Sequence, residues 1–76
     1  MNGYILSLKH DDESQIKYWA ENNMTQNIND ASFIPDVVNA RRSAAALQNQ
    51  FLDHAVTVLP AFKGVQLRNV VSTTIS

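Results

Sequence analysis

The sequence predicts a small α+β domain of β-β-α-β order. Its three antiparallel strands, in the order 2-1-3, carry one amphipathic helix on one face of the sheet. Three observations lead to this prediction. Apolar and polar residues alternate in two segments near the N-terminus, apolar residues recur at helical spacing in the middle, and β-branched residues gather near the end. We expect the 76 residues to form a single domain, residues 1–76.

The first two strands are predicted at residues 4–9 and 15–21, because each segment alternates with a period of two. The polar residues 10–14 between them favour a turn, since Asp and Ser side chains bond nearby backbone groups. Together these segments predict an antiparallel hairpin. The Asn-rich residues 22–32 that follow are predicted to be irregular, because Asn side chains compete for backbone hydrogen bonds.

The helix is predicted to run from Pro35 towards Pro60. Pro35 suits a first helical turn, where its missing N–H is not needed, and Asp36 places a carboxylate at the positive end of the helix dipole. Ser43 is an alternative N-cap, so the helix begins at either Pro35 or Ser43. Pro60 ends the helix. The apolar stripe at steps of three and four consists of Val37, Ala40, Ala44, Leu47, Phe51, Ala55 and Val58.

The third strand is predicted at residues 65–75, after a connection over residues 59–64 that contains both Pro60 and Gly64. A right-handed crossover places this strand beside the first one, in antiparallel pairing. One face of the three-stranded sheet then has no helix to cover it. The residues expected on this uncovered face are Ile5, Ser7, Lys9, Lys17, Trp19, Gln66, Arg68 and Val70.

Composition removes several classes of chemistry. The absence of cysteine excludes disulfides, thiolate nucleophiles and sulfur-based zinc sites. With only two glycines, the chain has no glycine-rich phosphate loop. We therefore expect no enzyme, no metal and no cofactor. The sequence holds neither a long apolar run nor a basic leader, which predicts a cytoplasmic protein without membrane contact. A net charge of −1 makes nucleic acid an unlikely general partner.

Two titratable clusters have ordinary explanations. The densest one is His10 with Asp11, Asp12 and Glu13, but adjacent residues in a turn rarely converge on one metal ion and this spacing matches no calcium loop. The interpretation is a solvated turn. The second is the Asp53-His54 pair, where a histidine near a helix C-terminus is favoured by the helix dipole.

The candidate partner-binding residues lie in three places. Trp19 beside Lys17 and Arg68 would place an aromatic ring among basic groups on the uncovered face, a pattern typical of protein hot spots and of single-stranded nucleic-acid sites. Its simpler interpretation is a ring that covers the sheet edge or the Asn-rich loop. Arg41 and Arg42 suit contact with a phosphate or an acidic partner, or else form a solvated helix face.

The third place is the acidic turn. Its residues Asp11, Asp12 and Glu13 would imitate phosphates against a nucleic-acid-binding protein. An exposed face of alanine and asparagine on the helix would suit a homodimer. The sequence therefore favours a surface that binds over a site that reacts.

Parts of the chain resemble a group of known proteins. The run Ile16-Lys17-Tyr18-Trp19, then Asn29-Asp30-Ala31-Ser32-Phe33, then a helix from Pro35, is similar to small proteins encoded by phages and prophages. Some of these resemble anti-CRISPR proteins and other inhibitors of host defence, which act by occupying a surface of a larger complex. The resemblance transfers no functional residue, because the group shares no functional motif.

Composition and resemblance together predict a non-enzymatic binding protein whose partner is another protein or protein complex. The resemblance implies a phage-encoded inhibitor of a host defence complex. Two alternatives stay open: a small nucleic-acid-binding module that uses Trp19, Lys17 and Arg68, and a small homo-oligomeric structural protein.

Overall fold

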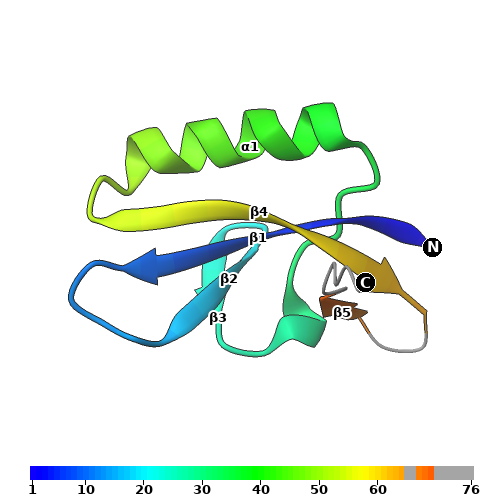
Figure 1. Ribbon diagram of the computed structural model, residues 1–76, viewed down its shortest axis with the longest axis horizontal. Helices are drawn as coiled ribbons and strands as arrows, with labels where there is room; N and C mark the ends of the chain where they lie inside the picture. Colours follow the sequence, from blue (N-terminus) through cyan, green and yellow to red (C-terminus); the bar gives the residue numbers. More distant parts are fainter. Residues whose placement is uncertain (65–66, 70–76) are drawn as a thin grey trace, which may run out of the picture.

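The computed structural model describes residues 1–64 and 67–69. Its five strands form one antiparallel sheet in the order β3-β2-β1-β4-β5, and helix α1 lies across one face (Figure 1). This confirms the predicted α+β class with an antiparallel sheet and an α-helix. The elements, in chain order, are β1 (Asn2–His10), β2 (Ile16–Ala20), β3 (Asn23–Thr25), the 3-10 helix η1 (Ile28–Asp30), α1 (Val37–Gln50), β4 (His54–Lys63) and β5 (Leu67–Asn69).

The predicted hairpin is present. β1 and β2 pair antiparallel, with Ser7 opposite Tyr18 and Leu8 opposite Lys17, and the acidic turn connects them. The Asn-rich stretch is more regular than predicted. It contributes the edge strand β3, which pairs with β2, and the short helix η1, whose N-cap Asn27 accepts the N–H of Asn29 at 3.0 Å.

Helix α1 begins within two residues of Pro35, the predicted start. The Asp36 side chain caps it by accepting the N–H groups of Val38 and Asn39, so the start at Ser43 was wrong. The helix ends far before Pro60. Phe51 is its C-cap and donates its N–H to the carbonyl of Leu47 at 2.8 Å.

The segment after Phe51 is therefore a strand and not the second half of a helix. β4 pairs with β1 along the whole length of β1, from Asn2 opposite Phe62 to His10 opposite His54. Consecutive β-branched residues at 56–58 favour this conformation. Pro60 lies inside β4, so the prediction that it ends the helix was wrong.

The predicted strand order needs a matching correction. At the centre of the sheet, β2-β1-β4 has the predicted arrangement, because the strand after the helix pairs antiparallel with the first one. That strand is β4, whereas the predicted third strand covered residues 65–75. The described part of the predicted third strand is β5, which pairs with β4 and not with β1. Residues 65–66 and 70–75 of that prediction lie outside the described residues.

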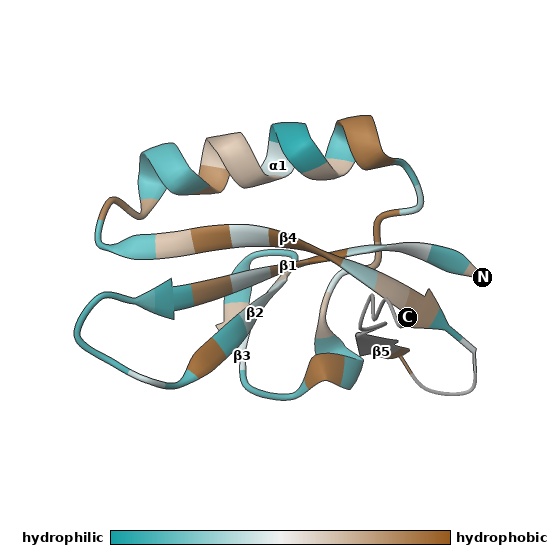
Figure 2. Cartoon of the chain, in the orientation of Figure 1, coloured by the Kyte–Doolittle hydropathy of each residue, from teal (hydrophilic) through white to brown (hydrophobic). Residues whose placement is uncertain are grey.

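Neither face of the central strand is uncovered. Ile5 and Leu6 are 0% and 1% exposed, although neighbouring residues of a strand point to opposite faces. The helix covers one face with Ala40 and Leu47. On the opposite face the segment through η1 packs against the sheet (Figures 1 and 2). This second core consists of Ile5, Ala31, Ala61 and Leu67, with Tyr18, Ile28, Phe33 and Leu59 packed against them.

The covering segment is held to β1 by main-chain contacts. Tyr4 and Ile34 exchange both backbone hydrogen bonds, each at 2.8 Å. Directly beside them, a Cβ on Gly3 would clash with the Phe33 ring and would lie 2.8 Å from the Ile34 carbonyl oxygen. The predicted uncovered face was wrong because the chain between β3 and α1 crosses it, at a distance that only a glycine in β1 permits.

Candidate functional site

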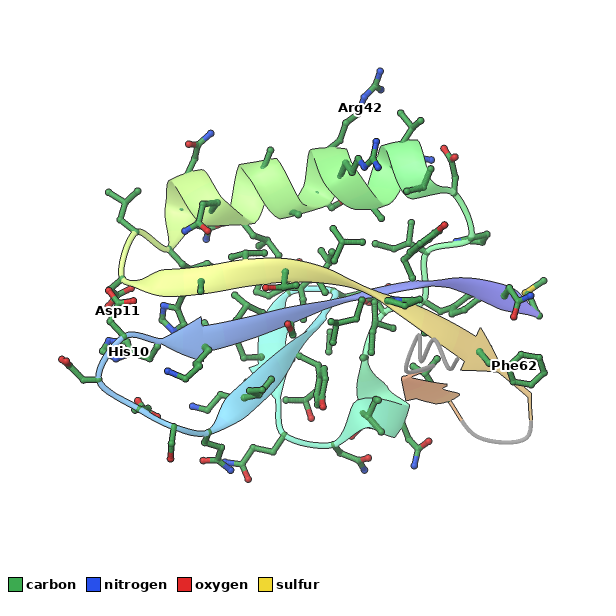
Figure 3. The ribbon with its side chains drawn as sticks, viewed as in Figure 1. His10, Asp11, Arg42 and Phe62 are labelled. Atoms are coloured by element: carbon green, nitrogen blue, oxygen red, sulfur yellow. The ribbon has the colours of Figure 1, made fainter. Side chains whose placement is uncertain are left out.

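Two turns meet at one end of the molecule. The N–H of Asp11, in the β1–β2 turn, donates to the carbonyl of Asp53, in the α1–β4 turn, at 2.9 Å. Figure 3 shows His10 and Asp11 at this end, beyond the C-terminus of α1. The register of β1 and β4 produces the contact, since His10 and His54 are the last pair of that ladder.

The carboxylate of Asp53 binds both histidines. One oxygen lies 2.9 Å from Nε2 of His10 and the other 2.8 Å from Nδ1 of His54. The two rings touch edge to face, with centroids 4.9 Å apart. On its other side, Nδ1 of His10 accepts the N–H of Asp12 at 3.1 Å. Neutral His10 therefore carries its proton on Nε2 and donates it to Asp53.

These contacts stabilise the charged form of Asp53. The hydrogen bond from His54 is the largest cause that lowers the pKa of this carboxyl below its ordinary value, and the bond from His10 acts in the same direction. The side chain of Asp53 is 62% exposed, so water screens both bonds. Asp53 is thus a carboxylate at neutral pH that orders two turns.

A row of packed aromatic rings runs from His54 to Trp19. Phe51 packs against His54 with ring centroids 5.5 Å apart, and Trp19 packs against Phe51 at 5.9 Å. Trp19 is half-buried beneath the end of α1. The expectation that it stands on an uncovered face beside Lys17 and Arg68 was wrong, because its face of the sheet is the one that the helix covers.

The two turns themselves carry negative charge, and the nearest lysine in the sequence is the exposed Lys9 in β1. Asp11, Asp12 and Glu13 are exposed in one turn and Asp53 in the other, and the sequence places no lysine or arginine in either. The last turn of α1, which is described in full, has no basic residue to offset the negative end of its dipole. Leu52, between Phe51 and Asp53, is 82% exposed. We call these five residues, Asp11, Asp12, Glu13, Leu52 and Asp53, the acidic end.

The other predicted binding residues do not join this surface. Arg41 and Arg42 are exposed on the N-terminal half of α1, and Figure 3 shows Arg42 pointing away from the sheet. Lys17 is half-buried in β2, opposite Leu8. Arg68 lies in β5 opposite Phe62, and its side chain is outside the described part of the structure. The predicted set is therefore spread over separate regions.

Sequence reasoning missed the union of His10, Asp53 and His54, because it placed His54 in a helix and treated the two histidines as independent. The β-branched run at residues 56–58 was the signal that a strand starts at His54. Across residues 1–64 and 67–69, no group of three or more histidine, aspartate or glutamate side chains is arranged to hold a metal ion. The side chain of His54 is 14% exposed and packs against the Phe51 ring. This position fits a role in holding the two turns in place.

A hollow of about 310 Å³ lies near the start of α1, away from the acidic end. Its walls carry no charged side chain. It is lined by Asn2, Gly3, Tyr4, Pro35, Pro60 and Ala61.

Comparisons with known protein families, with curated proteins and with solved structures find no match for this chain. Within the described ranges, no helix has the length and apolar content needed to cross a membrane.

Proposed function

We propose that this protein is a non-enzymatic binding protein whose acidic end docks onto a basic surface of a larger protein or protein complex. The observation that carries the proposal is Leu52. Its side chain is 82% exposed and belongs to the α1–β4 turn, whose Asp53 carbonyl accepts the N–H of Asp11 in the acidic turn. An exposed apolar side chain next to charged residues has the composition of an anchor and its rim at a protein interface.

The acidic end is ordered before any partner arrives. The bond from Asp11 to the Asp53 carbonyl and the two histidine bonds to the Asp53 carboxylate hold the turns together. A pre-ordered surface loses less conformational entropy on binding than a mobile loop does. The carboxylates steer a basic partner towards this end, and Leu52 then fills an apolar socket on that partner.

The resemblance to phage accessory proteins supports a more specific role. In that role the protein is a phage-encoded inhibitor that occupies a nucleic-acid-binding surface of a host defence complex. Asp11, Asp12, Glu13 and Asp53 present negative charge where phosphates would otherwise bind.

The nucleic-acid alternative has less support. Its stacking residue, Trp19, packs against Phe51, and the acidic end repels phosphates. The other alternative is a homo-oligomeric structural protein, and a measurement of the mass of this protein in solution tests it.

The test compares matched variants in two assays. Asp11→Asn/Asp12→Asn and Glu21→Gln/Asp30→Asn each remove two carboxylates, so each raises the net charge of −1 by two units, to +1. Only the first pair lies at the acidic end. Leu52→Ser removes the apolar side chain without changing charge. Tagged proteins are used to capture proteins from a bacterial lysate, and an oligo-arginine peptide is titrated while backbone amide shifts are followed by NMR.

We expect the peptide to shift the amides of residues 11–13 and 52–53 at low salt and to lose this effect at high salt. A protein captured in stoichiometric amount by the wild type should be lost with Asp11→Asn/Asp12→Asn and with Leu52→Ser, and retained with Glu21→Gln/Asp30→Asn. Equal capture by all four proteins, or no stoichiometric partner for the wild type, would contradict the proposal.

A further inference from the structure

Strand β4 has an outer edge, on the side away from β1. In an antiparallel ladder, alternate residues direct their N–H and C=O groups towards one neighbour and then the other. Tyr4 exchanges its backbone bonds with Ile34, so its partner in β4, Pro60, directs its carbonyl outward. The same alternation places the backbone groups of His54, Val56 and Val58 on the outer edge.

Most of this edge has no strand beside it among the described residues. β5 pairs only with Ala61, Phe62 and Lys63. Outward N–H and C=O groups on a strand edge are a template for a further strand from another chain. Among the described residues, the edge of β4 from His54 to Pro60 is therefore one place where a further strand could add to this sheet.

The side chain of Gln48, reaching down from α1, occupies one end of that edge. Its Oε1 accepts the N–H of Val56 at 3.1 Å, and its Nε2 donates to the carbonyl of His54 at 2.6 Å. These are the two backbone groups that a neighbouring strand would use at this position. Nε2 also donates to the carbonyl of Phe51 at 3.2 Å. One amide thus replaces a pair of ladder hydrogen bonds.

Pro60 removes a hydrogen-bond donor at the other end of the same edge. It has no N–H, and its position directs that missing donor outward. Between Gln48 and Pro60 only Val58 offers both an outward N–H and an outward C=O. An incoming strand would find one complete pairing position there, which is too few to hold it.

We infer that the Gln48 amide blocks the outer edge of β4 against strand addition by a second copy of this chain. Pro60 contributes to the same effect, because it offers no N–H to an incoming strand. This inference does not depend on the function proposed for the acidic end.

The test removes the amide and follows mass in solution. By light scattering, Gln48→Ala should show a mass that rises with protein concentration, while the wild type and Gln50→Ala should not. Gln50 is an exposed glutamine on the same helix and serves as the matched control. Adding Thr57→Lys to Gln48→Ala should restore the wild-type mass, because a lysine on an edge strand opposes pairing and restores no amide contact.

A second measurement uses the unaltered protein, in case Gln48→Ala does not fold. Hydrogen exchange should be slower at the Val56 amide, which Gln48 holds, than at the outward amide of Val58. If the Gln48→Ala protein loses stability but keeps the wild-type mass at every concentration, then Gln48 only stabilises the turn after α1. Equal protection of the Val56 and Val58 amides would show the edge to be covered by other means. Either result would overturn the inference.

Discussion

His10 and His54 lie opposite each other across β1 and β4, with ring centroids 4.9 Å apart and ring planes at 84°. Both rings bind the carboxylate of Asp53. The register of two long strands thus places a three-residue hydrogen-bonded group at the base of the acidic end. Its charge state links the order of this surface to pH.

Replacing Asp53 should reduce the loss of stability in acid. Contacts with His54 and His10 lower the pKa of Asp53 in the folded protein, so the unfolded chain takes up this proton first as pH falls. The stabilisation is complete above the ordinary carboxyl pKa, and falls away from about pH 5 downward as pH passes through the folded value. Thermal unfolding between neutral and acid pH should show a smaller drop in Tm for Asp53→Asn than for the wild type.

The control for this prediction is Asp30→Asn, a change of the same kind at an exposed carboxyl in η1. It should keep the wild-type dependence on pH. The explanation fails if Asp53→Asn and Asp30→Asn have the same Tm profile in acid.

Two leucines near the end of α1 should separate stability from binding. Leu47 is 5% exposed and Leu52 is 82% exposed. Leu47→Ala leaves a cavity between the helix and the sheet and should cost about 2–4 kcal/mol of unfolding free energy. Leu52→Ala should change it by less than about 0.5 kcal/mol, because no core contact is lost. Urea unfolding measures both. A large loss for Leu52→Ala would mean that its side chain supports the fold and is not held free for a partner.

Trp19 should behave as a core residue. Trp19→Ala removes the ring that packs on Phe51 and should lower the unfolding free energy by roughly 2–3 kcal/mol, since the site is half-buried. Trp19→Phe keeps an aromatic contact and should lose less. Denaturant midpoints and partner capture are compared for both variants. A Trp19→Ala protein with the wild-type midpoint and no captured partner would assign this ring to the interface instead.

The two glycines should differ in their tolerance of a methyl group. Gly3→Ala places a Cβ against the Phe33 ring and the Ile34 carbonyl, inside the contact that covers the second sheet face. We expect a loss of roughly 1–3 kcal/mol, as for an overpacked core. Gly64→Ala meets only the Phe62 ring, at 3.0 Å, and lies on the surface, so a smaller loss is expected. Equal midpoints in chemical unfolding would contradict the role given to Gly3.

Local patterns in the sequence predicted the hairpin and the start of the helix. The alternation in residues 4–9 and 15–21 marks the strands β1 and β2, and the polar turn between them lies where expected. Asp36, expected at the positive end of the helix, is its N-cap. Each of these features depends on neighbours within a few residues, which is why a single sequence reveals them.

The strand β4 was missed because its residues satisfy two periods at once. Ala55 and Val58 continue the helical stripe by steps of three and four, while Val56, Thr57 and Val58 favour a strand. The helical reading also used Pro60 as a stop. Pairing with the full length of β1 decides between the two conformations, and that contact joins residues at opposite ends of the chain.

The sequence by itself determined a cysteine-free α+β chain with an acidic turn and a helix capped at Asp36, since these follow from composition and short-range spacing. Only the tertiary structure decided that both sheet faces are covered, that Trp19 packs against Phe51 at the end of the helix, and that the acidic turn meets Asp53. The physical reason is the register of β1 and β4. It joins distant residues through backbone hydrogen bonds, which carry no side-chain pattern for a sequence to show.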